Sequence, residues 1–334
     1  MNPMQTDNNI ADEIAPGIRP MRYDELAKLN IPPPNWVVDK LIPDESITIM
    51  SALPAHCKTW LAFDIAIHVA HGEPLFGQIK TKQTKALIVD EESGLPRLRK
   101  RLQMLGIADD EQSITVASKK GFKITEASAK SLVAYCEAND VGLVLFDSLT
   151  RLHDADENSA KEMAVVMNDF AQLTRKGIAV ILIHHNRKPA PFGSGGGATE
   201  MRGSVDIWAA VDAQISLKRS DNRITVTQNK NRDAEEMAPF NLEVHTEEDR
   251  FWFEYRGDAP KELKPKQAEE LIRGLLEPDK RLYQGEIITA LSDKAGEHAV
   301  VEALKAMVER KELETSKGEK NKTYYRLVEE QTND

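Results

Sequence analysis

Apolar positions in the middle of the chain fall into short, almost continuous runs separated by stretches with a helical period. Uninterrupted runs of this length are typical of parallel strands that are buried on both faces of a sheet. Four runs occur, at residues 46–52, 85–90, 141–147 and 178–185. The helical stretches are residues 58–69, 95–105, 128–138 and 159–174. Strands that alternate with crossover helices predict a doubly wound α/β fold with a mostly parallel sheet.

The pattern changes at both ends of this region. After residue 210, apolar and polar residues alternate in four successive segments, which predicts an antiparallel extension of the sheet within a domain spanning 21–257. Residues 1–20 are polar and acidic and are expected to be a disordered leader. Residues 258–265 form a polar linker. In 266–330, three short helices followed by a hairpin predict a winged-helix domain.

Composition adds two limits to this picture. The 334 residues are 41% hydrophobic and 29% charged, as in ordinary globular proteins, and no apolar run approaches the ~20 residues of a membrane span. The first residues lack the features of a signal peptide, and two cysteines cannot form a disulfide framework, so we expect a cytoplasmic protein. A net charge of −10 still permits a local basic surface for nucleic acid.

The segment SITIMSALPAHCKTW reads as a strand, a short loop, and a helix that opens with Lys-Thr. This is the context of a Walker A phosphate loop, in which Lys58 neutralises the nucleotide phosphates and Thr59 holds Mg²⁺. The predicted nucleotide-binding residues are Ala52, Leu53, Pro54, Ala55, His56, Cys57, Lys58, Thr59 and Trp60. Ala52 and Cys57 occupy the two glycine positions, which weakens the match. An ordinary strand-to-helix turn is the alternative, whereas adjacent His56 and Cys57 make a poor nucleophilic pair.

Polar residues end the later strands of the predicted sheet. Asp147 follows the third run, as in a Walker B motif, and is the second predicted Mg²⁺ ligand. The second run ends in Asp90 followed by Glu91 and Glu92, which are also unremarkable as solvated acids at a strand end. The fourth run ends in His184 and His185, and a metal site there is disfavoured because no third ligand is evident.

Taken in order, these motifs resemble a known family. The phosphate loop, KALIVDEES, LVLFDSLTRLHD, LIHHNRK, a Gly-rich loop and MRGSVDIWAAVDA are similar to the hexameric plasmid replicative helicase RepA and its relatives. These are RecA/DnaB-like ATPases of plasmids, phages and integrated elements. The segments PPPNWVVDKLIP and KTWLAFDIAIHVAHGEPLFG match the same pattern, so the resemblance covers about residues 30–255.

The resemblance implies a RecA-like core that binds ATP with Mg²⁺. It implies that Glu92 is the catalytic glutamate that polarises the attacking water, with Glu91 the second candidate. It also implies that His184 is the γ-phosphate sensor. Relatives tolerate a residue other than glycine before the lysine, so Cys57 alone is compatible with activity, whereas loss of the first glycine as well puts efficient hydrolysis in doubt.

Members of this family act as rings, with each nucleotide at an interface between subunits. The resemblance therefore predicts a homo-oligomer, a ring or hexamer, in which basic residues of the neighbour complete the site. Arg202, Lys230 and Arg232 match those positions. Ordinary surface charge is the alternative for all three, and an arginine supplied in this way contributes roughly 10³-fold to turnover.

Two segments are candidates for contact with DNA. Residues 187–203 are rich in glycine, lie where RecA-like proteins project a DNA-binding loop, and carry Arg187 and Lys188; a plain flexible loop is the alternative. The hairpin at the C-terminus combines basic and aromatic side chains: Lys317, Lys320, Lys322, Arg326, Tyr324 and Tyr325. We expect weak binding of single-stranded DNA there, although winged helices also bind proteins.

These features support two hypotheses on function. The first is a ring-forming, ATP-dependent DNA-remodelling protein, a helicase or replication factor of a mobile element. The second is a nucleotide-binding regulator or scaffold with a weakened ATPase site that recruits DNA or a partner through its winged helix. Glu92, Lys230 and Arg232 favour the first, and Ala52 and Cys57 favour the second.

Overall fold

The computed structural model of the chain describes residues 20–31, 33–185, 205–259, 265–276, 281–291, 295, 297–318 and 322–328. Contacts divide the chain into two units, Met1–Pro34 and Asn35–Asp334. The first unit contains one short helix, α1 (Tyr23–Leu26), and its described residues are exposed. Among the described residues, no helix is long and apolar enough to cross a membrane.

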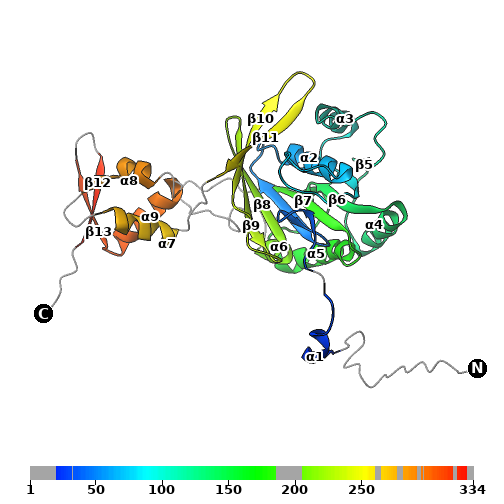
Figure 1. The fold of residues 1–334 in the computed structure, drawn as a ribbon, viewed down its shortest axis with the longest axis horizontal. Coiled ribbons are helices and arrows are strands. Elements are labelled where there is room, and N and C mark those ends of the chain that lie inside the picture. Colours follow the sequence, from blue (N-terminus) through cyan, green and yellow to red (C-terminus); the bar gives the residue numbers. More distant parts are fainter. Residues whose placement is uncertain are drawn as a thin grey trace, which may run out of the picture. The chain divides into compact units, whose positions relative to one another are not determined.

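The second unit contains a nine-stranded sheet with the order β11-β10-β9-β8-β3-β7-β6-β4-β5 (Figure 1). Its strands are β3 (Ile47–Ala52), β4 (Lys85–Asp90), β5 (Ile114–Ser118), β6 (Val141–Asp147), β7 (Ala179–His185), β8 (Ala213–Ser220), β9 (Arg223–Asn231), β10 (Phe240–Thr246) and β11 (Phe251–Asp258). Neighbouring strands from β8 to β5 are parallel, and β9, β10 and β11 extend the sheet antiparallel. The sheet therefore confirms the predicted fold class.

One strand of this sheet was absent from the sequence-based prediction. β5 is a short strand at the edge of the sheet, and most of its residues are partly exposed. Its sequence, ITVAS, mixes small and polar residues, so it has neither the continuous apolar run of a central strand nor a clear alternation. Edge strands bury only part of their surface, and they therefore leave a weaker signal in the sequence.

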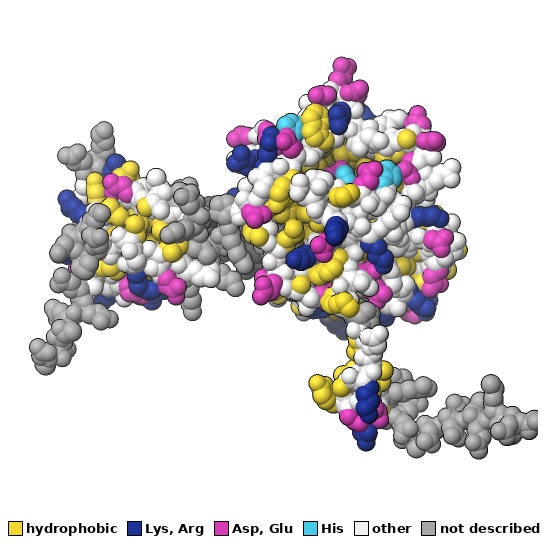
Figure 2. All heavy atoms as spheres, in the orientation of Figure 1, with side chains coloured by type: hydrophobic (Ala, Val, Ile, Leu, Met, Phe, Trp, Pro, Cys, Tyr) yellow, Lys and Arg dark blue, Asp and Glu magenta, His cyan; other side chains and the backbone are white. Residues whose placement is uncertain are grey.

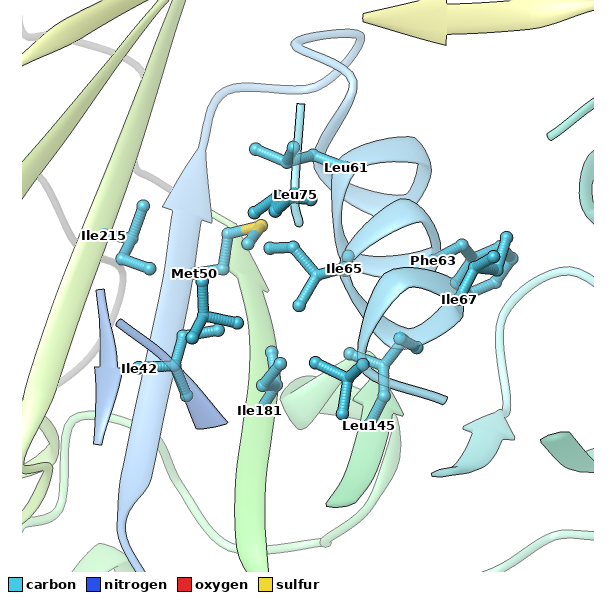
Figure 3. Packing of buried hydrophobic residues seen from close by; sticks show 14 of the residues in the cluster. Ile42, Met50, Leu61, Phe63, Ile65, Ile67, Leu75, Leu145, Ile181 and Ile215 are labelled. Atoms are coloured by element: carbon cyan, nitrogen blue, oxygen red, sulfur yellow. The ribbon is translucent and has the colours of Figure 1, made fainter. Parts of the chain in front are cut away.

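Helices cover both faces of the sheet because successive side chains of a strand point to opposite faces. The helices are α2 (Lys58–His71), α3 (Leu95–Met104), α4 (Glu126–Asn139), α5 (Ala160–Thr174) and α6 (Val205–Ala210). On one face, Met50, Leu145 and Ile181 pack with Leu61 and Ile65 of α2 (Figure 3). Side chains of α4, α5 and α6 share the other apolar cluster with the alternate strand residues. Helices on both faces of a mostly parallel sheet form the layered α/β arrangement that the sequence predicts.

The extended segment before the sheet packs against this core. It forms a small antiparallel pair, β1 (Trp36–Val38) and β2 (Ile42–Pro43). Val37 and Leu41 belong to the same apolar cluster as α2. The side-chain amide of Gln228 on β9 donates to the carbonyl oxygens of Lys40 and Leu41, at 2.9 and 3.0 Å. Apolar burial and backbone hydrogen bonds thus attach this segment to the sheet.

The C-terminal residues form a separate apolar cluster of their own. The elements are α7 (Pro265–Leu275), β12 (Leu282–Tyr283), α8 (Gln284–Leu291), α9 (Glu297–Glu309), β13 (Leu313–Lys317) and β14 (Thr323–Leu327). β14 pairs with both β13 and the short β12. The three helices and the hairpin occur in the predicted order, while the assignment to the winged-helix class stays a prediction.

Charged side chains are mixed on the visible surface of the core. Figure 2 shows acidic and basic side chains interspersed on this face, without a single broad basic area. This mixture agrees with the net charge of −10. The negative net charge of the molecule repels DNA at long range. Any surface that binds nucleic acid must therefore be a local cluster of basic residues.

Close packing between β6 and the end of the α2–β4 connection yields a stability prediction. A Cβ atom at Gly142 would lie 2.4 Å from Oγ1 and 3.1 Å from Cβ of Thr84. We expect Gly142→Ala to lower the free energy of unfolding by about 1–3 kcal/mol through overpacking, and by less in a Thr84→Ala background. Gly274→Ala in α7 is the control, because no atom lies within 4 Å of the added methyl. Urea denaturation checks the prediction, and equal stabilities would contradict it.

Candidate nucleotide-binding site

The predicted phosphate loop joins the end of β3 to the first turn of α2. Ala52 is the last residue of β3, the five residues from Leu53 to Cys57 form the loop, and Lys58 begins the helix. Two loop residues adopt left-handed backbone angles, Ala55 with φ 66° and Cys57 with φ 60°. Ala52 lies in regular strand geometry, so an alanine there carries no conformational cost. The glycine requirement of this backbone therefore falls on the loop and not on Ala52.

The loop is held from one side by Arg219 of β8. The Arg219 guanidinium donates to Sγ of Cys57 at 3.1 Å and to the carbonyl oxygen of Ala55 at 3.4 Å. The backbone N–H of Arg219 also donates to Nδ1 of His56 at 3.1 Å. Burial raises the pKa of Cys57, although Arg219 and Lys58 oppose this, so the thiol stays protonated. His56 and Cys57 thus each bond to Arg219, which supports a structural role for both.

Lys58 and Thr59 lie in the first turn of α2. Nζ of Lys58 donates to the carbonyl oxygens of Ala52 and Leu53, at 2.9 and 3.1 Å, so the ammonium lies within the loop. Burial lowers the pKa of Lys58, while the carboxylates of Asp147 and Glu92 act in the opposite direction. The next residue, Trp60, stacks on Phe251 of β11 with a ring separation of 4.1 Å, which makes it a packing residue.

Asp147 ends β6 beside the start of α2. Its Oδ2 accepts a hydrogen bond of 2.8 Å from the hydroxyl of Thr59, and its side chain is 1% exposed. Its Oδ1 has no hydrogen-bond partner within the described ranges. Burial raises the pKa of Asp147 to about 6, and the nearby charges of Glu92 and Asp90 add to this effect. A buried carboxylate oxygen without a donor, next to a threonine hydroxyl, suits Mg²⁺, whose charge would offset the desolvation.

The loop after β4 presents two glutamates with different surroundings. Oδ1 of Asp90 accepts from the backbone N–H groups of Glu92 and Ser93, at 2.8 and 2.7 Å, which fixes the turn. The carboxylate of Glu91 accepts three backbone N–H bonds from residues 120–122, at 2.9–3.1 Å. Glu91 is therefore engaged in holding the neighbouring loop. Of the two predicted glutamates, the geometry favours Glu92 for chemistry.

Glu92 lies beside His185 of β7. Nε2 of His185 is 3.7 Å from Oε2 of Glu92, and this contact, with smaller contributions from Ser148 and Lys58, lowers the pKa of Glu92 to about 2. A carboxylate with so low a pKa stays ionised and accepts a hydrogen bond from water, although it is a weak proton acceptor. Glu92 therefore suits the orientation of water better than full abstraction of its proton.

The two histidines at the end of β7 point to opposite faces of the sheet. The alternate residues Ile181 and Ile183 belong to the apolar cluster of α2, so His185 shares their face and that of Asp147. His184 is fully buried on the face covered by α4 and α5, next to Ser51 of β3 in register. The structure therefore brings His185, and not the predicted His184, to Glu92.

Arg101 of α3 is a further residue at the site that sequence reasoning missed. Its guanidinium donates to Oγ of Ser93 at 2.7 Å and lies 5.8 Å from the centroid of the Trp60 ring. Its positive charge also opposes the raised pKa of Asp147. Arg101 thereby connects α3 with the loop that carries Glu92. The sequence offers no signal for it, because it is one of several basic residues of an amphipathic helix.

The predicted residues from a neighbouring subunit lie elsewhere. Lys230 pairs with Gln214 near the start of β8, whereas the phosphate loop follows the other end of β3. Nζ of Lys230 donates to the carbonyl oxygen of Trp208 at 2.8 Å, and Arg232 bonds to Asp212 at 3.1 Å. Neither residue reaches the phosphate loop of its own chain, so only a second subunit could bring them there. Arg202 and the rest of the 187–203 segment lie outside the described residues.

A phosphate loop at the end of a parallel strand, with Thr59 and Asp147 in contact, has the arrangement of a P-loop nucleotide-binding site. The sequence matches the family described as "AAA domain" over residues 16–191, more than half of its length, and the chain belongs to this family. No curated protein matches the sequence.

Solved structures show a more distant likeness. One is titled as the structure of a DnaB-like replicative helicase and its interactions with primase. It aligns with a TM-score of 0.49 and 14% sequence identity, over 69% of this chain and 66% of that chain. The chain thus spans slightly less than two thirds of that protein. Similarity at this level indicates nothing about function.

The raised pKa of Asp147 predicts how its replacement changes stability. Folding raises this pKa from 3.8 to about 6, so the charged carboxylate destabilises the fold above about pH 6, by up to about 3 kcal/mol. We expect Asp147→Asn to be more stable than the parent at pH 7, with an advantage that shrinks as the pH falls towards 4. Chemical denaturation across this range is the measurement. Asp154→Asn, at an exposed carboxylate, is the control, and a destabilised Asp147→Asn at pH 7 would contradict the argument.

The backbone angles of the loop predict different effects for its two missing glycines. Cys57→Gly removes a side chain from a left-handed position, which favours the loop conformation by about 1 kcal/mol. We expect it to tighten ATP binding several-fold, although the bond to Arg219 is lost. Ala52→Gly should leave affinity unchanged or weaken it, because glycine only loosens a regular strand. Isothermal titration with a non-hydrolysable ATP analogue compares the two, and improvement by Ala52→Gly alone would show that the strand glycine matters.

Proposed function

We propose that the chain is an ATP-dependent DNA-remodelling protein of the cytoplasm that acts as a ring, most specifically as a helicase or replication factor of a plasmid, phage or other mobile element. The ATPase part rests on the site. The DNA and mobile-element parts rest on the resemblance of the ordered motifs to RepA-like helicases and on the basic segments of the sequence.

The observation that carries the ATPase proposal is the hydrogen bond between Thr59 and Asp147, with the free Oδ1 of Asp147 beside it. Thr59 and Asp147 would hold Mg²⁺, and Lys58 would bind the phosphates from within the loop. When bound, Mg²⁺ neutralises charge on the phosphates. Glu92, kept ionised by His185, lies on the same side of the sheet and would orient the attacking water.

The positions of the basic residues support the proposed oligomer. Lys230 and Arg232 lie at the far end of the sheet from their own phosphate loop. Burial and the charge of Arg232 lower the pKa of Lys230, which bonds to backbone carbonyls near Trp208. In a ring, one subunit would present this end of its sheet to the nucleotide of the next. We propose that these residues act there, together with Arg202.

A second candidate function is favoured by Cys57. Its side chain stands where the motif has glycine, in a left-handed conformation, and is fixed by Arg219. A loop of this kind would bind nucleotide and hydrolyse it slowly. The protein would then be a nucleotide-dependent regulator or scaffold that recruits DNA or a partner through its C-terminal domain.

Steady-state ATP hydrolysis, with and without single-stranded DNA, separates the two candidates. We expect stimulation by DNA in the parent chain and a loss of at least about 100-fold in Lys58→Ala and Glu92→Gln. Lys130→Ala is the matched control, because Lys130 is exposed and pairs only with Glu126 on α4.

The two variants should differ in binding. Lys58→Ala removes a phosphate contact and should weaken nucleotide binding, whereas Glu92→Gln should retain it because Glu92 acts on water. Binding without turnover in the parent chain would favour the regulator. No binding of nucleotide by the parent chain would overturn both candidates.

A further inference from the structure

Two tyrosine rings lie together on the small sheet of the C-terminal domain. Tyr283 comes from β12 and Tyr324 from β14, and these two residues pair in the ladder. Their ring centroids are 6.1 Å apart, with an interplanar angle of 63°. Both side chains are partly exposed. Strands that are distant in sequence thus present two aromatic rings at one surface.

A cationic side chain lies over each ring. Nζ of Lys322 lies 3.9 Å from the centroid of Tyr283, and the guanidinium of Arg281 lies 5.2 Å from the centroid of Tyr324. Lys317 of β13 pairs with Thr323 and therefore lies on the other face of this sheet, where its Nζ donates to the hydroxyl of Thr323 at 2.9 Å. We call the set Arg281, Tyr283, Lys322 and Tyr324 the tyrosine–cation surface.

These cations differ from most of the other described cations of the domain. Arg281 and Lys322 make no ion pair with a carboxylate of the residues that the structure describes. By contrast, Arg273, Lys305, Arg310 and Arg326 each pair with a glutamate of the domain. The positive charge of the tyrosine–cation surface is therefore available to an anionic partner, whereas most of the remaining charge is neutralised within the domain.

Glycines hold both rings closely. A Cβ atom at Gly285 would lie 2.5 Å from Cε2 of Tyr283, and one at Gly318 would lie 2.3 Å from Cε2 of Tyr324. The backbone at these positions approaches the rings more closely than any other residue would allow. Ring orientation is thus restricted before a partner binds, which reduces the entropy lost on binding.

The surface differs from the basic hairpin predicted from the sequence. Tyr325 is 9% exposed, belongs to the apolar cluster of the domain, and donates to Oε1 of Gln284 at 3.3 Å. Arg326 pairs with Glu314 at 2.8 Å. Lys320 lies outside the described residues. Arg281 and Tyr283, which the prediction omitted, join the surface because β12 pairs with β14.

We propose that the tyrosine–cation surface binds single-stranded DNA, with bases stacked on Tyr283 and Tyr324 and phosphates paired with Arg281 and Lys322. The long side chains of Arg281 and Lys322 can leave the ring faces and pair with phosphates instead. The ring faces are then exposed to a base. The choice of DNA rests on the proposed function, whereas the stacking and charge are properties of the surface itself.

A single strand fits this surface better than a duplex does. Stacking on a tyrosine requires a base whose face is not covered by its neighbours, which a duplex does not offer. Among the described side chains of α9, the ion-paired Lys305 stands beside Glu302 and Glu309, a mixed set that is poorly suited to reading the major groove. Contact through rings and phosphates also implies little dependence on base sequence.

The test is the affinity of the full chain for fluorescent oligo(dT), measured by anisotropy without nucleotide over a series of salt concentrations. We expect Tyr283→Leu and Tyr324→Leu each to weaken binding about fivefold or more without changing the salt dependence. Lys322→Gln should lower the slope of log K against log salt by about 0.7. Tyr324→Phe should bind like the parent chain, since it keeps the ring.

Two matched controls separate this surface from general effects. Tyr135→Leu removes an exposed tyrosine of α4, and Lys305→Gln removes a cation that is paired with Glu302. Both should bind like the parent chain. An oligonucleotide with 5-iododeoxyuridine should cross-link on irradiation to peptides that contain Tyr283 or Tyr324, which identifies the contact even if the core also binds DNA.

Each outcome decides the proposal. Leucine variants that fold, by circular dichroism, and bind like the parent chain would overturn it, as would cross-links confined to other peptides or tighter binding of duplex than of oligo(dT). Because binding is measured without nucleotide, an inactive ATPase site would leave this result intact. Conversely, variants that lose this surface should keep the ATP hydrolysis that is measured without DNA and that depends on Lys58.

Discussion

The site depends on a buried carboxylate at the end of a central strand. Asp147 is surrounded by apolar residues of the sheet and of α2, and its charge lacks the solvation it would have in water. Thr59 supplies one hydrogen bond, and the second oxygen has no donor among the described groups. A cation bound to Asp147 would offset the free energy that desolvation of this carboxylate costs on folding. The fold thereby leaves a position suited to the Mg²⁺ ion that we propose at this site.

Parallel strands explain why the other groups gather around this carboxylate. The strands β3, β4, β6 and β7 run in one direction, so the residues that follow them meet at the same edge of the sheet. Asp90 then fixes the loop that carries Glu92, and His185 adjoins Glu92 across the sheet. The common direction of the strands and their register are sufficient to place these residues close together.

The same geometry shows what a sequence can and cannot reveal. Central strands and the positions of Lys58, Thr59 and Asp147 were predictable, because buried runs and motif spacing are properties of contiguous residues. The choice between His184 and His185 needed the face of the strand, and the engagement of Glu91 needed the partner loop at 120–122. Contacts between distant segments leave no trace in a single sequence. The cluster formed with β12 was missed for the same reason, whereas β5 was missed because an edge strand carries a weak apolar pattern.

The two departures from the glycine pattern have unequal physical meaning. At Ala52 the chain is an ordinary strand, so a methyl group fits without strain, and the motif letter is not a requirement of this backbone. At Cys57 the backbone is left-handed, so a side chain costs energy that Arg219 only partly returns through its bond to the thiol. Of the two motif positions that lack glycine, only Cys57 lies in a left-handed conformation. The stability of the phosphate-loop conformation therefore depends mainly on the balance at Cys57, between the cost of its left-handed backbone and the hydrogen bond from Arg219.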